Sequence, residues 1–230
     1  MKRIIRLFLL MLVALPLFTA CDDTEEADAQ WVGWKERNEA YFAEKMQTAR
    51  QAIAQAQATY GADWEAHCDW RIYKDLSLDA SQPGEAADSV CVQIVNRGTG
   101  SGCPIYTDSI RVNYRGTLIP NALADTEVYR KGYVFSYTGL TGDYEDVFNP
   151  ETAHPVMMYV GGLTLGLCTA VQYMHIGDLW RVYVPYELGF GEADRNTIPG
   201  WSTLVFEIEL KAYYRAGTVP PAWRSVSADR

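Results

Sequence analysis

The sequence predicts an α+β fold, in which one long helix precedes a domain built mainly of β-strands. Residues 30–59 contain no proline and are rich in Ala, Gln, Glu and Lys, which is typical of a helix. Residues 180–184 and 204–210 alternate apolar with polar side chains, as half-buried strands do. Between these strands lies a glycine-rich loop that is too long for a hairpin turn. Such a loop on a rigid sheet more often lines a binding site than merely joins strands.

Residues 1–20 have the organisation of a secretory signal peptide. Three basic residues precede an apolar run over residues 7–18, which is too short to span a bilayer. Residues 18–21, Phe-Thr-Ala-Cys, resemble a lipobox, which would make Cys21 the lipidated first residue of a bacterial lipoprotein. An ordinary signal peptide cleaved nearby is the alternative. We expect a mature chain anchored by lipid to the outer membrane, on its periplasmic or cell-surface side.

The chain is acidic, and this charge limits the partners that it can have. The formal net charge is −9, and loss of the three basic residues of the signal peptide takes it to −12. Such a surface argues against nucleic acid and against docking on anionic lipid headgroups. Residues 21–30, acidic and without aromatic side chains, should form a solvated tether. They also resemble the surface-export signal of some Gram-negative lipoproteins, with a generic spacer as the alternative.

The sequence predicts neither a metal site nor a cofactor. Four cysteines follow residue 21, namely Cys68, Cys91, Cys103 and Cys168. Neither a Cys-x-x-Cys pair nor a histidine pair at helical spacing occurs among the ligands that zinc would use. In an exported chain, four cysteines allow three complete disulfide connectivities. We expect either buried free thiols or a disulfide that involves Cys68, Cys91 or Cys103.

The helical segment, residues 31–68, is predicted to bury one side. Gly61 should end the helix. A helix of this length is not stable alone, so it should pack either on the following domain or on another chain. Its larger apolar residues recur at roughly helical spacing, and they are Trp31, Trp34, Tyr41, Met46 and Ile53.

The following domain is expected over residues 69–215, with a C-terminal tail over residues 216–230. Residues 69–89 are mixed in character and rich in turn residues. The glycine run at residues 98–102 lacks the Gly-Lys-Ser/Thr ending of a phosphate loop and precedes no helix, so we interpret it as a turn. An insertion whose role the sequence does not explain occupies residues 119–131. The other strand candidates are residues 90–95, 110–115, 134–136 and 155–160.

Residues 174–210 closely resemble the end of the FK506-binding-protein (FKBP) type of peptidyl-prolyl cis/trans isomerase. That family has a Met-x-x-Gly turn, then Pro-Tyr-x-x-Gly-[Tyr/Phe]-Gly, an Ile-Pro flap and a Thr-Leu-x-Phe-x-[Val/Ile]-x-Leu strand, which this sequence matches in order and spacing. Residues 112–116, Val-Asn-Tyr-Arg-Gly, resemble its Val-x-Tyr-x-Gly. The resemblance covers residues 90–214. It implies an FKBP-like bent antiparallel β-sheet of five or six strands wrapped around a short helix at residues 163–174, with an N-terminal accessory helix.

The reaction of that family needs no nucleophile, metal or cofactor. Rotation about an X-Pro bond is slow because the amide loses resonance as it twists, a barrier of about 18–20 kcal/mol. A dry aromatic pocket disfavours the planar amide relative to the twisted one, and a few hydrogen bonds hold the carbonyls. A rate gain of roughly 10⁴ to 10⁶ needs only about 5.5 to 8 kcal/mol of differential stabilisation. An apolar pocket with a polar rim is therefore a sufficient catalyst.

The resemblance also implies which residues line the pocket. Core packing competes with this interpretation for each of them, most strongly for Phe206 and Leu167. The residues expected to act in catalysis are Tyr114, Phe135, Phe190, Ile198 and Phe206, and those expected to contact the substrate are Ser136, Val156, Leu163, Thr164 and Leu167.

Several of these residues depart from the family's pattern. Ser136 stands where the family has an aspartate, Leu167 where it has a tryptophan, and Phe190 where it usually has a tyrosine. Val156 and Thr164 replace an aromatic residue and an isoleucine. The losses favour weakened catalysis, although the retained aromatic residues favour a surviving apolar pocket.

One alternative alignment is open. Phe148-Asn149 could supply the step that we assign to Phe135-Ser136. We prefer Phe135-Ser136 because it directly ends the insertion. Either choice lacks the family's aspartate.

Two functions remain open at the level of the sequence. The first is a peptidyl-prolyl cis-trans isomerase or folding helper that binds proline-containing segments of exported client proteins. The second is a non-catalytic FKBP-like lipoprotein that binds peptides or proteins. Some FKBP-type lipoproteins dimerise through N-terminal helices, so the resemblance also leaves a homodimer open.

Overall fold

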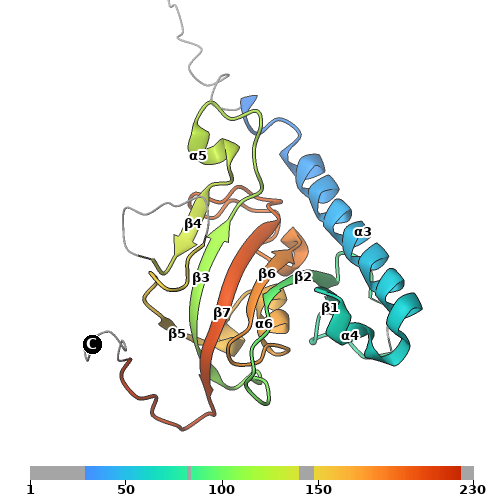
Figure 1. Cartoon of the computed structure of the whole chain (residues 1–230). Coiled ribbons are helices and arrows are strands. Elements are labelled where there is room, and N and C mark those ends of the chain that lie inside the picture. Colours follow the sequence, from blue (N-terminus) through green and yellow to red (C-terminus); the bar gives the residue numbers. More distant parts are fainter. Residues whose placement is uncertain (1–28, 82–83, 140–147, 224–230) are drawn as a thin grey trace, which may run out of the picture. The chain divides into compact units, whose positions relative to one another are not determined.

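The computed structural model describes residues 29–81, 84–139 and 148–223 (Figure 1). The predicted signal peptide, Cys21, all but the last two residues of the tether and the end of the tail lie outside the described residues. The chain divides into residues 1–32 and 33–230, and the fold is that of the second unit. Among the described residues, no helix has the length and apolar character needed to cross a membrane.

One antiparallel sheet of seven strands forms the centre of the described domain. The order is β1-β2-β6-β7-β3-β4, and β5 also pairs with β3. The resemblance implied five or six strands, and β1 lies in the stretch that was expected to be turn-rich. The strands are β1 (Trp70–Lys74), β2 (Ser89–Asn96), β3 (Ser109–Thr117), β4 (Val134–Tyr137), β5 (Val156–Tyr159), β6 (Leu179–Val184) and β7 (Leu204–Tyr214).

The short helix α6 (Leu165–Val171) packs on one face of this sheet. Val92 lies opposite Val182, and Val182 lies opposite Phe206, so these three side chains share a face. On the same face, a Cβ atom added at Gly166 of α6 would lie 2.5 Å from Val184 Cγ1. The predicted short helix against an antiparallel sheet is thus confirmed.

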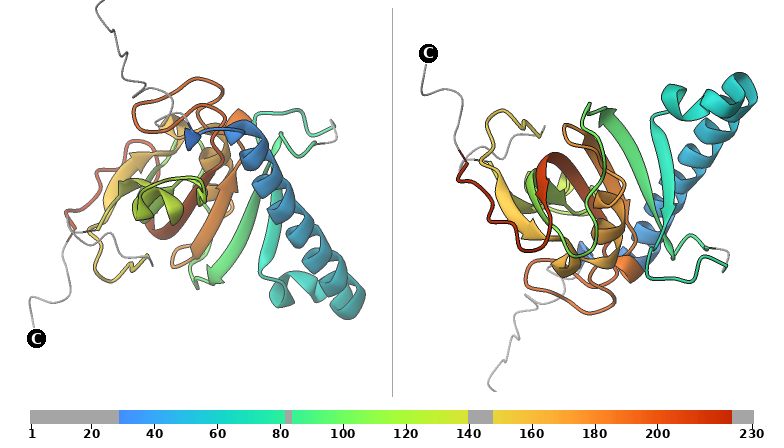
Figure 2. Two further views of the ribbon diagram at one scale, coloured as in Figure 1. Left: turned by 90° about the horizontal axis from the view of Figure 1, so that it is seen from above. Right: turned by 90° about the horizontal axis from the view of Figure 1, so that it is seen from below.

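The long helix α3 (Trp34–Tyr60) covers the opposite face and runs alongside β1 and β2 (Figure 2). Phe42 and Met46 pack with Cys91, Tyr183 and Val205 of the sheet. Of the two alternatives for this helix, the structure has it packed on its own domain. The buried residues of α3 are Trp34, Asn38, Phe42, Met46, Ala49 and Ala56.

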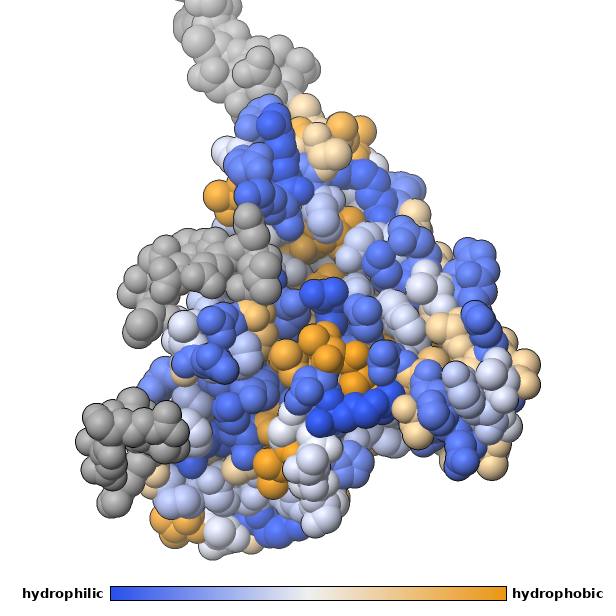
Figure 3. Space-filling model, in the orientation of Figure 1, coloured by the Kyte–Doolittle hydropathy of each residue, from blue (hydrophilic) through white to orange (hydrophobic). Residues whose placement is uncertain are grey.

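In the view of Figure 3, hydrophobic surface gathers near the centre of an otherwise largely hydrophilic face.

The sequence predicts a turn at the glycine run after β2, and the structure has an irregular loop there with a bend at Gly102. Gly98 N–H donates to Asp178 Oδ1 at 2.6 Å, and Gly100 N–H donates to Ile176 O at 3.0 Å. A Cβ atom at Gly98 would lie 2.3 Å from Ile176 O. Glycine is therefore required here because this loop and the backbone before β6 approach each other closely.

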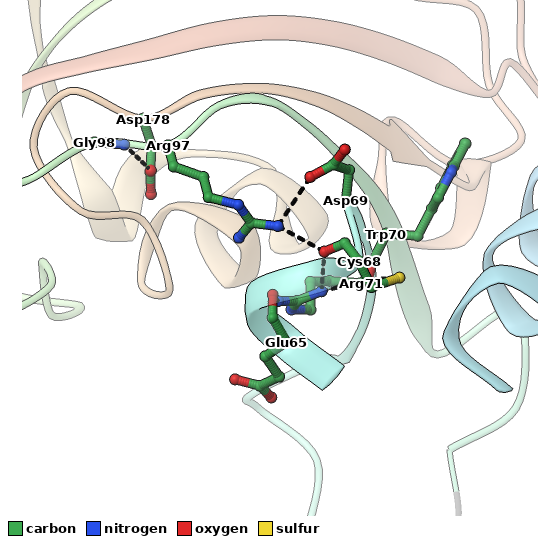
Figure 4. A network of polar contacts seen from close by, with 8 residues as sticks. All are labelled: Glu65, Cys68, Asp69, Trp70, Arg71, Arg97, Gly98 and Asp178. Carbon is green, nitrogen blue, oxygen red and sulfur yellow. Dashed lines mark hydrogen bonds and ion pairs between the residues drawn. The ribbon is translucent and has the colours of Figure 1, made fainter. Parts of the chain in front are cut away.

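A polar network joins this loop to the residues that lead into β1 (Figure 4). Arg97 Nη2 donates to Cys68 O at 2.7 Å and to Asp69 Oδ1 at 2.9 Å. The buried guanidinium of Arg71 donates to the carbonyl oxygens of Cys68, Trp70 and Glu65. These carbonyls satisfy a charged group that would otherwise be costly to bury.

The insertion packs near the start of α3. Its backbone forms turns and the helix α5 (Glu127–Arg130), and Ile119 and Ala124 are buried. Arg37 Nη1 of α3 donates to Asn121 Oδ1 at 2.6 Å. The other short helices are η1 (Gly61–Asp63), α4 (Trp64–His67), η2 (Val160–Gly162) and η3 (Tyr186–Leu188).

All four cysteines in the described part of the chain are free thiols. Cys68, Cys91 and Cys168 are buried, and Cys103 is partly exposed. Of the two alternatives from the sequence, free thiols are therefore the one that the structure has.

Candidate functional site

Tyr114 and Ser136 form a hydrogen-bonded pair on neighbouring strands. Their hydroxyl oxygens lie 2.6 Å apart, and either hydroxyl can be the donor. The pair results from the register of β3 and β4, in which Gly116 lies opposite Ser136. Tyr114 N–H donates to Thr138 Oγ1 at 2.9 Å, which fixes the backbone that carries the phenol. Two predicted site residues are thus in direct contact.

Phe135 and Phe206 form a second pair beside the first. The register of β3 with β4 shifts between Gly116 and Thr117, which leaves Phe135 without a partner on β3. Its ring meets Phe206 edge to face, with centroids 5.7 Å apart and an interplanar angle of 87°. A Cβ atom at Gly116 would lie 2.5 Å from Phe135 Cε2 and 3.1 Å from Phe206 Cε1. The small residue of the Val-x-Tyr-x-Gly motif leaves room for both rings.

Four more of the predicted residues lie on β5 and around α6. Val156 of β5 lies opposite Val112 of β3. Leu163 and Thr164 precede α6 and are half-buried, whereas Leu167 lies within the helix and is 4% exposed. The Oγ1 atom of Thr164 is buried and has no hydrogen-bond partner among the described residues. It is the polar atom of this group that a bound molecule would have to satisfy.

Phe190 and Ile198 lie in the loop between β6 and β7. Arg195 and Ile198 exchange two backbone hydrogen bonds, of 2.8 and 2.9 Å, which close a tight turn. The guanidinium carbon of Arg195 lies 5.5 Å from the ring centroid of Phe190, within the range of a cation–π contact. Arg195 therefore links the two predicted residues within the loop. Their position relative to Tyr114 stays a prediction.

The alternative pair, Phe148 and Asn149, makes other contacts. Phe148 is buried, and its ring meets Tyr137 at 6.2 Å between centroids. Asn149 Oδ1 accepts a hydrogen bond of 3.0 Å from a backbone N–H two residues on, which closes a local turn. The hydrogen bond between Tyr114 and Ser136 therefore supports the alignment through Ser136.

Sequence reasoning missed two residues that shape the loop between β6 and β7. One is Arg195, which contacts Phe190. The other is Trp201, whose ring meets Tyr186 edge to face at 4.8 Å and has the Lys35 ammonium 3.7 Å from its centroid. Both lie within the loop that was expected to line a site, so their cationic and aromatic side chains were the available signal.

Comparison with known proteins finds similarity to one family. A family model described as FKBP-type peptidyl-prolyl cis-trans isomerase matches residues 104–211. The chain is 32% identical over 119 residues to the FKBP-type 22 kDa peptidyl-prolyl cis-trans isomerase of Escherichia coli (strain K12), a match that covers 51% of this chain and 47% of the relative. It is 30% identical over 138 residues to the macrophage infectivity potentiator of Trypanosoma cruzi, covering 59% of each.

These matches are partial. The chain spans about half the length of the curated relatives that it matches. Among solved structures, FkpA from Escherichia coli is 21% identical, with 85% of this chain and 74% of that chain covered and a TM-score of 0.44.

Proposed function

Because residues 104–211 form a domain of the FKBP-type peptidyl-prolyl cis-trans isomerase family, we propose that this protein isomerises X-Pro bonds in exported client proteins. The observation that carries the proposal is the joining of two side-chain pairs on one sheet face. Tyr114 and Ser136 supply hydroxyl groups, and Phe135 and Phe206 supply apolar ring surface. The free-energy difference between the planar and the twisted X-Pro amide is smaller against such a surface than in water.

Ser136 gives Tyr114 a freedom that an aspartate would not. A carboxylate can only accept, so it would engage the phenol proton. A serine hydroxyl can instead donate to the phenol oxygen, which leaves the Tyr114 O–H for a peptide carbonyl. Tyr114 would then be the main donor at the site, since Phe190 lacks the hydroxyl that the family usually has there.

A refolding-limited or protease-coupled assay on a short X-Pro peptide tests this activity. At micromolar protein we expect acceleration over the thermal rate, and Tyr114→Phe should reduce it by roughly tenfold because one hydrogen bond to the twisted amide is lost. Tyr159→Phe is the matched control, since Tyr159 lies on β5 with half of its surface exposed. Equal rates for wild type and Tyr114→Phe would remove Tyr114 from the mechanism.

The second candidate is a non-catalytic module that binds proline-containing peptides. The departures from the family pattern favour it, because Ser136 replaces a carboxylate by a hydroxyl, Leu167 replaces an aromatic ring, and Phe190 lacks a phenol hydroxyl. No acceleration combined with saturable peptide binding would support this function. If the missing hydroxyl at Phe190 is the reason for the lack of acceleration, Phe190→Tyr should raise the rate of X-Pro isomerisation.

We also propose that Cys21 carries a lipid and holds the protein at the outer membrane, on its periplasmic or cell-surface side. The lipobox-like residues 18–21 support this location. Labelling of growing cells with a radioactive fatty acid should mark the wild type and not Cys21→Ser. Label on both variants would contradict the anchor.

A homodimer through the N-terminal helix is compatible with the fold on one condition. The α3 side that carries Phe42 and Met46 is already buried against the sheet. A dimer would therefore use the outer side of α3. Sedimentation analysis of the mature chain tests for this assembly.

A further inference from the structure

A cavity lies between α3 and the loop that carries Phe190 and Ile198. Its volume is about 230 Å³, enough for one long side chain. Its walls come from three segments that are far apart in the sequence. They include Glu39, Phe42 and Ala43 of α3, the stretch just before β2, and Pro185, Tyr186 and Glu187 of the β6–β7 loop.

The inside of this cavity is apolar, and its mouth is acidic. Phe42 and Pro185 are buried, whereas Glu39 and Glu187 are exposed and so lie where solvent begins. The residues that line the cavity include no lysine or arginine. An occupant with an apolar stem and a positive end matches both parts.

The negative charge at the mouth is only partly neutralised. Lys35 Nζ lies 3.9 Å from Glu39 Oε1, an exposed pair of small energetic value. Within the part of the chain that the structure describes, Glu187 and Glu192 form no ion pair. These charges therefore remain available to a ligand cation.

The carboxylates at the cavity mouth also affect the Tyr186 phenol. Burial raises the pKa of Tyr186 to about 12, and a hydrogen bond to Glu187 adds to the shift. The negative charges of Glu187, Glu39 and Glu192 act in the same direction. A neutral aromatic ring surrounded by carboxylates is also a good contact for a cation.

The cavity adjoins the proposed isomerase site through one short segment. Gly191 N–H donates to Tyr186 O at 2.9 Å, so Tyr186 and Phe190 belong to the same local turn. A client chain that reaches Phe190 is thus close to the cavity mouth. We propose that this cavity binds the side chain of a lysine or arginine that lies a few residues from the proline in the client peptide.

This assignment rests on the proposed function for its client, and a peptide-binding experiment separates the two. Fluorescent peptides would carry one proline and, two to six residues away, either lysine or norleucine, which keeps the stem and removes the charge. At low ionic strength we expect the best lysine peptide to bind the mature chain about fivefold more tightly than its norleucine counterpart. At 0.5 M salt the ratio should approach one, because exposed charges are screened.

Variants assign that preference to the cavity. Glu39→Gln with Glu187→Gln should reduce the lysine-to-norleucine ratio to about one, whereas Glu65→Gln with Glu151→Gln, which removes two exposed carboxylates elsewhere, should leave it unchanged. Ala43→Leu should weaken both peptides by filling the cavity. A ratio near one for the wild type at every spacing, or the same ratio in both double variants, would overturn the proposal.

Replacing proline by alanine in the lysine peptide tests the function separately. If affinity is unchanged, the proline site fails while the cavity assignment stands. If one of the chain's own arginines, Arg224 or Arg230, competed for the cavity, changing both to glutamine would strengthen lysine-peptide binding, and this result would overturn the client assignment. Self-association that is lost in the Glu39→Gln, Glu187→Gln variant would overturn it in favour of a second copy.

Discussion

Gly116 is the residue on which the aromatic pair of the candidate site depends. The rings of Phe135 and Phe206 occupy the space where a side chain would begin. In Gly116→Ala the added methyl group displaces Phe135, and such overpacking costs about 1–3 kcal/mol. We therefore expect a lower midpoint of thermal unfolding and weaker binding of an X-Pro peptide, measured by calorimetry and fluorescence anisotropy.

Gly162→Ala is the matched control for this change. A Cβ atom at Gly162 would lie 3.6 Å from Tyr159 Cδ1, an ordinary van der Waals contact. Peptide binding should therefore survive in the control. If Gly116→Ala bound peptide as well as Gly162→Ala does, the two rings would not form part of the site.

Asn38 is a buried polar residue that fixes α3 to the loop before β7. Its Oδ1 accepts a hydrogen bond of 2.8 Å from Thr203 N–H, and its Nδ2 donates to Trp34 O at 2.6 Å. Asn38→Ala leaves the buried Thr203 N–H unpaired, so we expect the free energy of unfolding to fall by about 1–3 kcal/mol in urea titrations. Gln47→Ala, on the exposed side of α3, should change it by less than about 0.5 kcal/mol. Similar losses in both variants would contradict this role.

The sequence named aromatic residues for the candidate site, but it did not indicate all of their polar contacts. Tyr114 and Phe135 were assigned to it because the sequence around them resembles the FKBP pattern. The bond between Tyr114 and Ser136 was not foreseen, because a serine in place of an aspartate was interpreted as a lost partner. Arg195 was missed for a similar reason, since a contact within an irregular loop leaves no periodic signal.

At the scale of elements, α3 covers one face of the sheet, and the reactivity of Cys91 should show whether this contact is intact. Cys91 is fully buried, and its Sγ lies 3.5 Å from Lys45 O of α3. Burial raises the pKa of the Cys91 thiol to about 12, so few molecules carry the reactive thiolate at pH 8. In a variant with Cys91 as its only cysteine, we expect alkylation to be slow and Met46→Ala to accelerate it at least tenfold, because the cavity loosens α3. Gln47→Ala, on the exposed side of α3, is the control.

The raised pKa of the Cys91 thiol also predicts how the stability of the folded chain changes with pH. The ordinary pKa of a cysteine thiol is 9.0, whereas burial raises the pKa of Cys91 in the folded chain to about 12. The unfolded chain therefore loses this proton first, and stability should fall as the pH rises above about 9. In Cys91→Ala that part of the decline should be absent from urea titrations at pH 8 and pH 10. An unchanged slope in the variant would show that Cys91 does not contribute.

Strand β1 is an element that the sequence did not predict. Trp70–Lys74 has only five residues, and Arg71 interrupts a run that would otherwise look like a buried strand. Arg71 is nevertheless buried, because three carbonyl oxygens accept hydrogen bonds from its guanidinium. For α3 the composition was sufficient to predict the helix and its end at Gly61. The pattern named Tyr41 as buried, whereas Phe42 occupies the core and Tyr41 lies at its edge.

At the scale of the whole domain, the described residues between 33 and 223 form one core, with the sheet between α3 and α6. Packing on both faces predicts that α3 unfolds together with the sheet rather than before it. Removing residues 31–68 would expose the face that carries Cys91, Tyr183 and Val205 to water. We expect a markedly lower midpoint of thermal unfolding and stronger binding of a hydrophobic dye, because the buried apolar area of α3 is lost.

The full mature chain should then show a single calorimetric transition, and a chain that lacks only residues 21–30 should behave like it. A separate early transition, or an unchanged midpoint after removal of residues 31–68, would mean that α3 is a detachable accessory element. In that case the cavity between α3 and the β6–β7 loop would open as the helix detaches, and the preference for lysine peptides should disappear at the temperature of that first transition. Joint loss of both properties at one temperature is the result that a single core requires.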